Sequence, residues 1–516
     1  MKADNKRLDK KQRKIKKLLT KNDAFGCFLD AGAGKTRITL THLFETIERY
    51  KKLPKKKRKG KGKRLNALIV STKANTLDTW PAQLQEQLAV HNKKYSWHVA
   101  HKDFKQLTIS GRNCKYSAQI IIASFESCAE LKWHYVNNYF DFIVIDESVF
   151  IKNWDANKTG ILLSFGQQCR YRYVLSALPT PNKIGDIYAQ IFFLDQGKRL
   201  GVDLQAFRAQ YQTQVSKGGR MYWQTRGWPV KELVAQTEKE VLDKISDICI
   251  TERTEEFVKN LTEERHTIVD FNLSRKASKR YKRFETDAVM SIDDEEFVAS
   301  SGAVLKNKLL QYASGNIYED NAVNFDEVIP PRQGPRKYFR TNKDRLKALD
   351  NWFKKFYKKE KKRSNKVIIC YGFIHSIDDI MTVASRYIKR HKIHVVNNKF
   401  GKTDTGELRR RWDNNEIDCI VTFAGSIGHG MNLQKHGGCM VFYSMTYNYD
   451  HFYQIVRRLK RRGNPMKFVN IYLLQANGTA DEDVASNISG KALLGKRVQS
   501  AHSILRKIRG RIRKAA

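Results

Sequence analysis

The chain has 516 residues, of which 41% are hydrophobic and 11% aromatic, so it can form several globular domains and is not a disordered chain. Its 96 lysine and arginine residues outnumber 53 acidic residues and give a formal net charge of +43. This charge predicts a polyanionic partner, and we favour nucleic acid over an anionic membrane surface. No apolar run is long enough to span a bilayer, and the eight cysteines show no C-x-x-C spacing, which argues against a zinc site.

The N-terminal part of the chain predicts a nucleotide-binding turn. A basic amphipathic helix over residues 1–21 precedes a strand over Phe25–Leu29, and a helix over Arg37–Tyr50 follows the turn. Glycines in such a turn let backbone N–H groups point at an anion, and the helix N-terminus adds a positive dipole. The turn reads Asp30-Ala31-Gly32-Ala33-Gly34-Lys35-Thr36. We expect Lys35 to reach the β- and γ-phosphates of ATP and Thr36 to hold Mg²⁺, although Leu29 stands where the full motif has glycine.

Residues 51–64 hold ten basic residues and no acid, so this segment is expected to be a solvated loop. We favour contact with DNA as its role. Two alternatives stay open, namely a nuclear-import address over Pro54–Lys59 and a loop that only solubilises the chain.

Buried strands follow at regular intervals and predict a parallel sheet. They are expected over Ala67–Val70, Gln119–Ala123, Phe142–Ile145 and Arg172–Leu175. Asp146 follows one of these strands directly, where a carboxylate can share the Mg²⁺ with Thr36, and Glu147 can orient and deprotonate a water. Polar side chains at the strand ends suit hydrogen bonds to DNA phosphates, and we name Ser71, Thr72, Lys73, Ser124, Thr422 and Ser426 for this role.

The C-terminal half repeats the pattern of strand and helix. Residues 196–265 are expected to form helices and loops, 291–296 an acidic patch, and 318–344 a linker or protrusion. Strands are then expected over Lys366–Cys370, Ile393–Asn397, Asp418–Thr422, Cys439–Tyr443 and Phe468–Leu474. The predicted fold is therefore α/β with two RecA-like, doubly wound parallel sheets. Predicted domains are an ATP-binding lobe over 1–200, a helical insertion and linker over 201–344, a second lobe over 345–490, and a basic tail over 491–516.

Taken in order, these motifs resemble a superfamily 2 helicase-type motor of the Swi/Snf branch, closest to its compact phage-encoded forms. The resemblance covers roughly residues 8–492. Its motifs are Gln12, Asp30–Thr36, Leu68–Thr72, Ile121–Glu126, Asp146–Asn153, Ser176–Asn182, Val367–Tyr371, Ala424–Gln434, Gln454–Gly463 and Gly478–Glu482. Departures from the family pattern are Val149 for a usual His, Leu178 for a usual Thr, Arg457 for a usual Gly and Lys460 for a usual His.

The resemblance implies a DNA-dependent ATPase that translocates on DNA and remodels or unwinds it, and it favours double-stranded DNA as the track. Gln12 matches the glutamine that reads adenine, and Gly32, Ala33, Gly34, Gly430 and Gln454 match further ATP-binding positions. Arg458 and Arg461 match two arginines that act on the developing phosphoryl charge. They lie three residues apart on an expected helix and so share one face.

Two other classes of protein stay open. One is a non-catalytic DNA-binding or packaging protein with a vestigial nucleotide site, which the charge fits equally well. The other is a small-molecule P-loop kinase, for which the second sheet would be unused. The lysine-rich N-terminus has no apolar core like that of a secretory signal, so we expect an intracellular protein, in the host cytoplasm if it is phage-encoded.

Overall fold

The computed structural model describes two compact units, the first built from the elements α1 to β9 and the second from β10 to β19. The predicted Gly430, Arg461 and basic tail 491–516 lie outside the described residues, as does most of the basic loop. The description covers residues 8–486 except 31, 55–63, 74, 101–117, 178, 181–182, 218–219, 253–261, 293–294, 300–301, 320–336, 360–365, 398–403, 428–432, 434, 445–448 and 461–463.

The first unit contains a seven-stranded sheet in the order β3-β4-β2-β5-β6-β1-β9, and every pairing in it is parallel. Because β6 separates β1 from β5, the glycine-rich turn after β1 and Asp146 at the end of β5 meet at one edge of the sheet, two strands apart. The strands are β1 (Ala24–Leu29), β2 (Ala67–Ser71), β3 (Trp97–Ala100), β4 (Ile120–Ser124), β5 (Phe142–Asp146), β6 (Tyr171–Ser176) and β9 (Cys249–Glu252).

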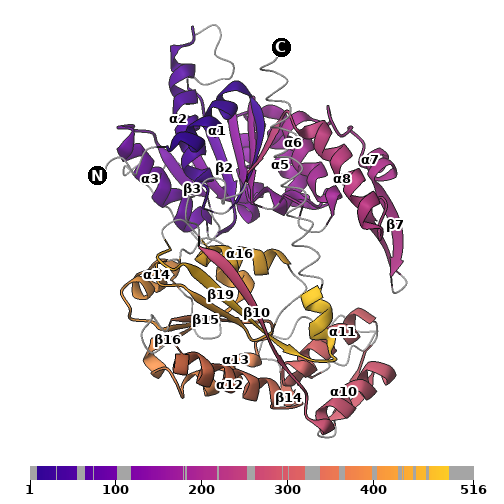
Figure 1. Cartoon of the computed structure of the whole chain (residues 1–516). Coiled ribbons are helices and arrows are strands. Elements are labelled where there is room, and N and C mark those ends of the chain that lie inside the picture. Colours follow the sequence, from indigo (N-terminus) through magenta and orange to yellow (C-terminus); the bar gives the residue numbers. More distant parts are fainter. Residues whose placement is uncertain are drawn as a thin grey trace. The chain divides into compact units, whose positions relative to one another are not determined.

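Helices cover both faces of this sheet, because successive strand residues point to opposite faces and both sets are apolar. One face packs against α1 (Lys10–Lys21), α2 (Lys35–Lys52) and α3 (Trp80–Val90). The other packs against α5 (Asn157–Gln168), α6 (Tyr188–Asp195), α7 (Leu204–Tyr211) and α8 (Lys231–Ile245) (Figure 1). Shorter elements are η3 (Asn75–Thr79), η4 (Phe125–Leu131), α4 (Lys132–Val136), η5 (Ser148–Ile151), η6 (Ile184–Ile187) and the hairpin β7 (Gln212–Lys217) and β8 (Arg220–Thr225).

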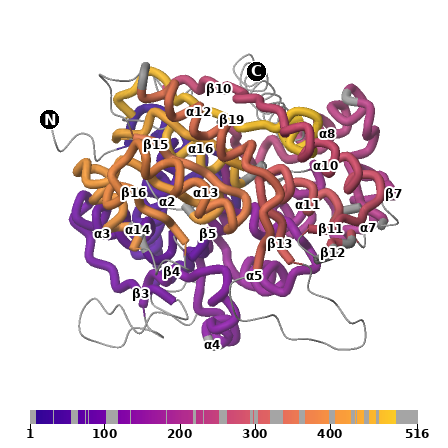
Figure 2. Tube along the Cα trace, turned by 90° about the horizontal axis from the view of Figure 1, so that it is seen from below, coloured from indigo at the N-terminus to yellow at the C-terminus, as the bar shows by residue number. Residues whose placement is uncertain are grey.

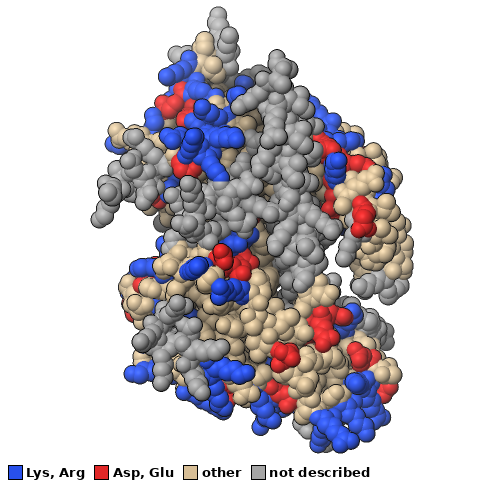
Figure 3. Space-filling model, viewed as in Figure 1, with Lys and Arg blue, Asp and Glu red and all other residues tan. Residues whose placement is uncertain are grey.

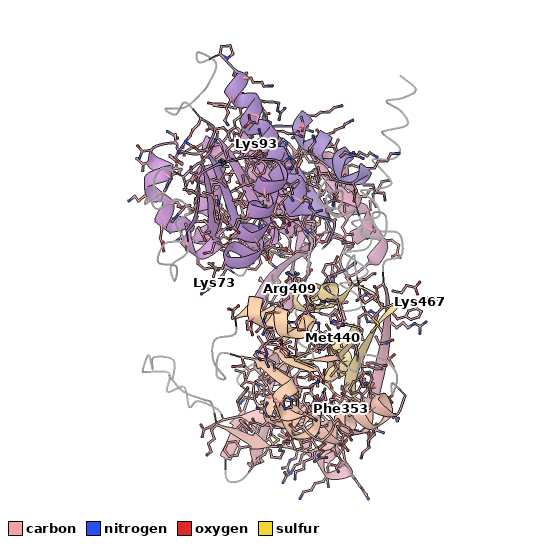
Figure 4. The ribbon with its side chains drawn as sticks, turned by 90° about the vertical axis from the view of Figure 1, so that its left-hand side faces the viewer. Lys73, Lys93, Phe353, Arg409, Met440 and Lys467 are labelled. Atoms are coloured by element: carbon pink, nitrogen blue, oxygen red, sulfur yellow. The ribbon has the colours of Figure 1, made fainter. Side chains whose placement is uncertain are left out.

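The second unit contains a six-stranded, all-parallel sheet in the order β10-β19-β18-β15-β17-β16. Phe353 and Met440 lie inside this unit (Figure 4) and are both fully buried. The strands are β10 (Glu263–Phe271), β15 (Val367–Tyr371), β16 (Ile393–Val396), β17 (Cys419–Phe423), β18 (Cys439–Phe442) and β19 (Phe468–Ala476). Two helices, α12 (Asp344–Lys359) and α13 (Ser376–Ala384), cover one face, while α14 (Thr405–Asp413) and α16 (Tyr449–Leu459) lie on the other (Figure 1).

The second unit also carries elements outside its sheet. The helices α10 (Arg275–Asp287) and α11 (Gly302–Ala313) lie side by side (Figures 1 and 2). Two small antiparallel pairs accompany them, β11 (Val289–Ile292) with β12 (Glu295–Val298) and β13 (Asn316–Tyr318) with β14 (Tyr338–Arg340). The remaining short helices are η7 (Arg390–Lys392) and α15 (Ala424–Ile427).

The predicted pair of parallel sheets is confirmed, and each predicted strand is present within one or two residues of its expected bounds. The prediction of only helices and loops over 196–265 is wrong. This segment contains the hairpin β7–β8, the edge strand β9 of the first sheet and the start of β10, an edge strand of the second. Its strands give little hydrophobic periodicity in the sequence, because β9 has only four residues and because most side chains of β10 are exposed and polar. No helix among the described residues has the length and apolarity needed to cross a membrane.

Candidate nucleotide site

The glycine-rich turn has the backbone of a phosphate cradle. Gly32 and Gly34 have φ angles of +86° and +84°, which glycine adopts without strain. Lys35 is the first residue of α2, and its Nζ donates to the carbonyl of Leu29 at 2.7 Å and to that of Asp30 at 3.5 Å. Leu29 itself is the last residue of β1 and is fully buried, so its extended position needs no glycine. This accounts for the departure from the full motif.

Gln12 ties helix α1 to this turn. Its Nε2 donates to the carbonyl of Ala33 at 3.1 Å, while its Oε1 accepts the backbone N–H of Asp9 at 3.1 Å. A Cβ at Gly34 would lie 2.3 Å from Gln12 Nε2, so the glycine is needed for this approach as well as for its φ angle. The structure thus places Gln12 against the turn, and reading of adenine by Gln12 stays a prediction.

Asp146 is buried at the end of β5 and is held by donors from three sides. Its Oδ2 accepts from Ser71 Oγ and Trp80 Nε1, each at 2.9 Å, and from Asn75 Nδ2 at 3.4 Å. Burial raises the pKa of Asp146, the Glu147 charge raises it further, and the Lys35 charge together with the donors from Trp80 and Ser71 lowers it. Because Lys35 acts on this carboxylate, the two predicted catalytic residues, 111 positions apart in the sequence, meet in one site.

Glu147 has a backbone conformation that residues other than glycine rarely adopt. Its φ and ψ are 54° and 52°, in the left-handed region, and its N–H donates to Asp146 Oδ1 at 3.1 Å. Such strain is kept where the surrounding structure holds it, and it is common at active sites. Here it places two adjacent carboxylates at the strand end next to Lys35.

A buried glutamine joins this acidic pair to the turn after β6. Gln190 of α6 is fully buried; its Oε1 accepts from Ser148 Oγ at 2.6 Å, and its Nε2 donates to the carbonyl of Pro179 at 2.7 Å. Val149, which stands in place of the family's histidine, is also buried. Gln190 therefore links the segment that follows Glu147 to the turn after β6.

Sequence reasoning missed three residues of this site, namely Asn75, Trp80 and Gln190. No local pattern distinguishes them, because each is an ordinary helix residue whose partner lies 11 to 71 positions away along the chain.

The residues predicted to contact DNA fall into two groups. Lys73 and Ser426 are exposed, and Figure 4 shows Lys73 on the outside of its unit. Ser71, Ser124 and Thr422 are fully buried. The Ser71 hydroxyl donates to Asp146, and contact of Ser71 with DNA stays a prediction.

The other buried hydroxyls have local partners or none. Ser124 Oγ bonds Ser127 Oγ at 3.1 Å, and Thr422 Oγ1 donates to the Phe423 carbonyl at 3.0 Å. Thr72 is 7% exposed, and its Oγ1 has no hydrogen-bond partner among the described residues. Contact of these strand ends with DNA stays a prediction.

In the second unit, α16 carries Gln454 and Arg458, which confirms the expected helix at these two residues, while Arg461 lies outside the described residues. Arg458 is 7% exposed, and Gln454 is half-buried. At the end of this helix Lys460 pairs with Glu264 of β10 at 3.2 Å. Burial alone would raise the pKa of Glu264, but the His266 hydrogen bond and the nearby Lys460 and Arg457 charges lower it to about 2.

The segment Gly478–Glu482 has a structural role in the same unit. Asp481 forms an ion pair with Arg345, which is fully buried. The Arg345 guanidinium also donates to the backbone carbonyls of Ala313 and Leu474, at 3.0 Å each. A buried ion pair with its remaining donors satisfied holds α12, α11 and β19 together.

Comparison with known proteins supports the resemblance seen in the sequence. The family model described as the SNF2-related domain matches residues 12–319. Putative protein p41 of Acyrthosiphon pisum secondary endosymbiont phage 1 is 24% identical over 361 residues, covering 68% of this chain and 70% of that protein. The solved Sulfolobus solfataricus SWI2/SNF2 ATPase core in complex with dsDNA has a TM-score of 0.39 and 18% identity, with 96% of this chain and 92% of that chain covered. Since the family model matches more than half of the length of this chain, the chain belongs to the SNF2-related domain family.

Proposed function

We propose that this protein is a DNA-dependent ATPase that uses ATP and Mg²⁺ to translocate on double-stranded DNA. The observation that carries the proposal is the meeting of Lys35, Asp146 and Glu147 at the carboxyl edge of the first sheet. Membership of the SNF2-related family and the net charge of +43 support DNA as the track.

The residues present fit a nucleotide with a divalent cation. Gly32 and Gly34 hold the turn in a positive-φ backbone, and α2 begins at Lys35, so its N-terminal amides can receive phosphate oxygens. Thr36 and Asp146 offer hydroxyl and carboxylate oxygens, which are the ligands that Mg²⁺ prefers. When bound, Mg²⁺ supplies neutralisation of the charge on the β- and γ-phosphates.

Each side chain then has a distinct role. Lys35 neutralises phosphate charge, for which it exchanges its present bonds to the carbonyls of Leu29 and Asp30. Trp80 and Ser71 orient the Asp146 carboxylate and favour its ionised form. Glu147 holds and deprotonates the attacking water.

We assign Arg458 and Arg461 as the cations that stabilise the charge of the transition state, on the strength of the family motif alone. Such an arginine contributes roughly 10³–10⁵-fold to the rate. The Arg458→Gln variant is expected to lose turnover with little change in ATP affinity.

The test measures ATP hydrolysis with and without duplex DNA. Wild type is expected to be stimulated by DNA, while Lys35→Ala and Glu147→Gln lose at least about 100-fold in turnover. Lys93→Ala is the matched control, because it removes the same charge from the same unit. Lys93 pairs with Glu48 near the far end of α2. Displacement of a third strand from a triplex, without unwinding of a forked duplex, would establish translocation on the duplex.

Tight DNA binding without any ATP turnover would refute the proposal and support a non-catalytic DNA-binding protein. Unimpaired hydrolysis by Lys35→Ala or Glu147→Gln would refute the assignment of the site.

A further inference from the structure

The first nine residues of helix α10 in the second unit present a cationic surface. Six of its first nine residues are basic, and all six are exposed; we call them the α10 cationic face, namely Arg275, Lys276, Lys279, Arg280, Lys282 and Arg283. Figure 3 shows a dense group of basic side chains at the lower right, where α10 lies in Figure 1. None of the strand-end residues assigned to DNA belongs to this face.

The helix is anchored so that these cations cannot turn inward. Its opposite side buries Ala277, Tyr281 and Phe284. The ring of Tyr281 meets that of Tyr312 on α11 at 5.7 Å, and the Tyr312 hydroxyl donates to the Ala277 carbonyl at 3.1 Å. The Tyr281 hydroxyl in turn accepts the backbone N–H of Ala480 at 2.8 Å. The orientation of the cationic face is therefore set by the core of the unit.

Almost none of this charge is balanced by neighbouring acids. Among the described residues only Arg283 has a carboxylate partner, Asp287 Oδ2 at 3.3 Å. Asp344 lies close to the start of the helix, and its Oδ2 accepts the backbone N–H of Ser274 at 2.8 Å. By contrast, Arg410 on α14 of the same unit bonds both Glu407 and Glu416 at 2.8 Å.

The arrangement is locally unfavourable for the isolated helix. Lys279 lies three or four positions from four other cations of the face, and like charges at these spacings repel. The first turn contains no acid, so Arg275 and Lys276 also face the positive end of the helix dipole. A bound polyanion would relieve both effects at once.

We propose that the α10 cationic face is a second, sequence-independent contact for a nucleic-acid backbone, separate from the contacts at the strand ends. The nine residues extend over about 12 Å of helix, which is the rise of roughly three to four phosphates along one strand. The face has no large apolar side chain to insert into a bilayer, and this favours nucleic acid over an anionic membrane. The inference deepens the proposed function and uses DNA as the partner that this function requires.

The experiment compares wild type with Lys276→Gln/Lys279→Gln/Arg280→Gln, which changes three exposed cations of the face. The matched control is Lys354→Gln/Arg409→Gln/Arg410→Gln, which removes three exposed charges from helices of the same unit that already pair with acids; Figure 4 shows Arg409 at the surface. Binding of a fluorescent duplex of arbitrary sequence is measured without nucleotide between 50 and 200 mM salt. Circular dichroism checks that each variant is folded, which is expected because the changed side chains are exposed.

Loss of three phosphate contacts lowers the salt slope by about 2.7, so wild type should lose roughly 40-fold more affinity over this salt range than the α10 variant. The control should follow wild type. Equal salt slopes for all three proteins would overturn the inference. It would also be overturned if the α10 substitutions weakened binding to anionic phospholipid vesicles and left binding to the duplex unchanged. Because binding is measured without ATP, the result is independent of hydrolysis: an ATPase that is stimulated by DNA but has an unchanged α10 slope refutes this inference alone.

Discussion

The link through Gln190 can be tested by changing it to methionine, which keeps the length of the side chain and removes its amide. Gln190 Oε1 accepts from Ser148 Oγ at 2.6 Å, and its Nε2 donates to the carbonyls of Pro179 at 2.7 Å and Asp186 at 2.8 Å. The Ser148 hydroxyl and the Pro179 carbonyl would be left buried without this partner. Since Gln190 is fully buried, no water replaces the lost bonds without disturbing the packing.

The expected loss follows from these contacts. Each orphaned buried group costs about 1–3 kcal/mol, so the free energy of unfolding of the first unit should fall by roughly 4 kcal/mol. For a unit of this size that corresponds to a fall in Tm of roughly 8–16 °C. The Ser148→Ala change should cost much less in the Gln190→Met background than in wild type, with a coupling of at least about 1 kcal/mol.

Thermal unfolding followed by circular dichroism gives the measurement, and Gln87 offers a matched control. Gln87 of α3 is as fully buried as Gln190, but its amide atoms have no hydrogen-bond partner among the described residues. Gln87→Met should therefore be neutral or stabilising. The reasoning is refuted if Gln190→Met melts within about 2 °C of wild type, or if the Gln190 and Ser148 changes are additive.

Three further predictions concern single contacts. Trp80→Phe removes a hydrogen-bond donor that favours the ionised form of Asp146, so the pKa of Asp146 should rise further. The acid limb of the ATPase pH profile should therefore move to higher pH. An unchanged acid limb would contradict the role of Trp80. Gly34→Ala should lower the free energy of unfolding by at least about 1–2 kcal/mol and weaken ATP binding, because Gly34 has a φ of +84° and lies close to Gln12. In the control Gly160→Ala in α5, the new Cβ meets nothing within 4 Å, so this change should raise the free energy of unfolding by roughly 1 kcal/mol in denaturant titrations. Asp481→Asn leaves a fully buried arginine charge uncompensated and should destabilise the second unit by about 3–5 kcal/mol; a smaller loss would mean that this charge is satisfied elsewhere.

Much of the fold follows from local sequence, because the central strands of both sheets are continuous apolar runs that end in polar residues. The run Phe142–Ile145 is fully buried on both sides, as a strand inside a parallel sheet requires. The edge strand β10 has one neighbour and mostly exposed side chains, so its sequence does not differ from that of a loop. Pairing with β19 over nine residues, and not local preference, makes β10 a strand.

Of the candidate site, the sequence by itself predicts Lys35, Thr36, Asp146 and Glu147, because their chemistry depends on residue type and on position beside a strand end, and their roles stay predictions. Only the tertiary structure decided what surrounds them. Ser71 has the same local signature as a DNA-contacting serine, yet the alignment of β2 beside β5 turns it toward a carboxylate 75 positions away. Trp80 and Gln190 carry no signal of their own, because a hydrogen bond across the core depends on how helices pack on the sheet, which no short stretch of sequence specifies.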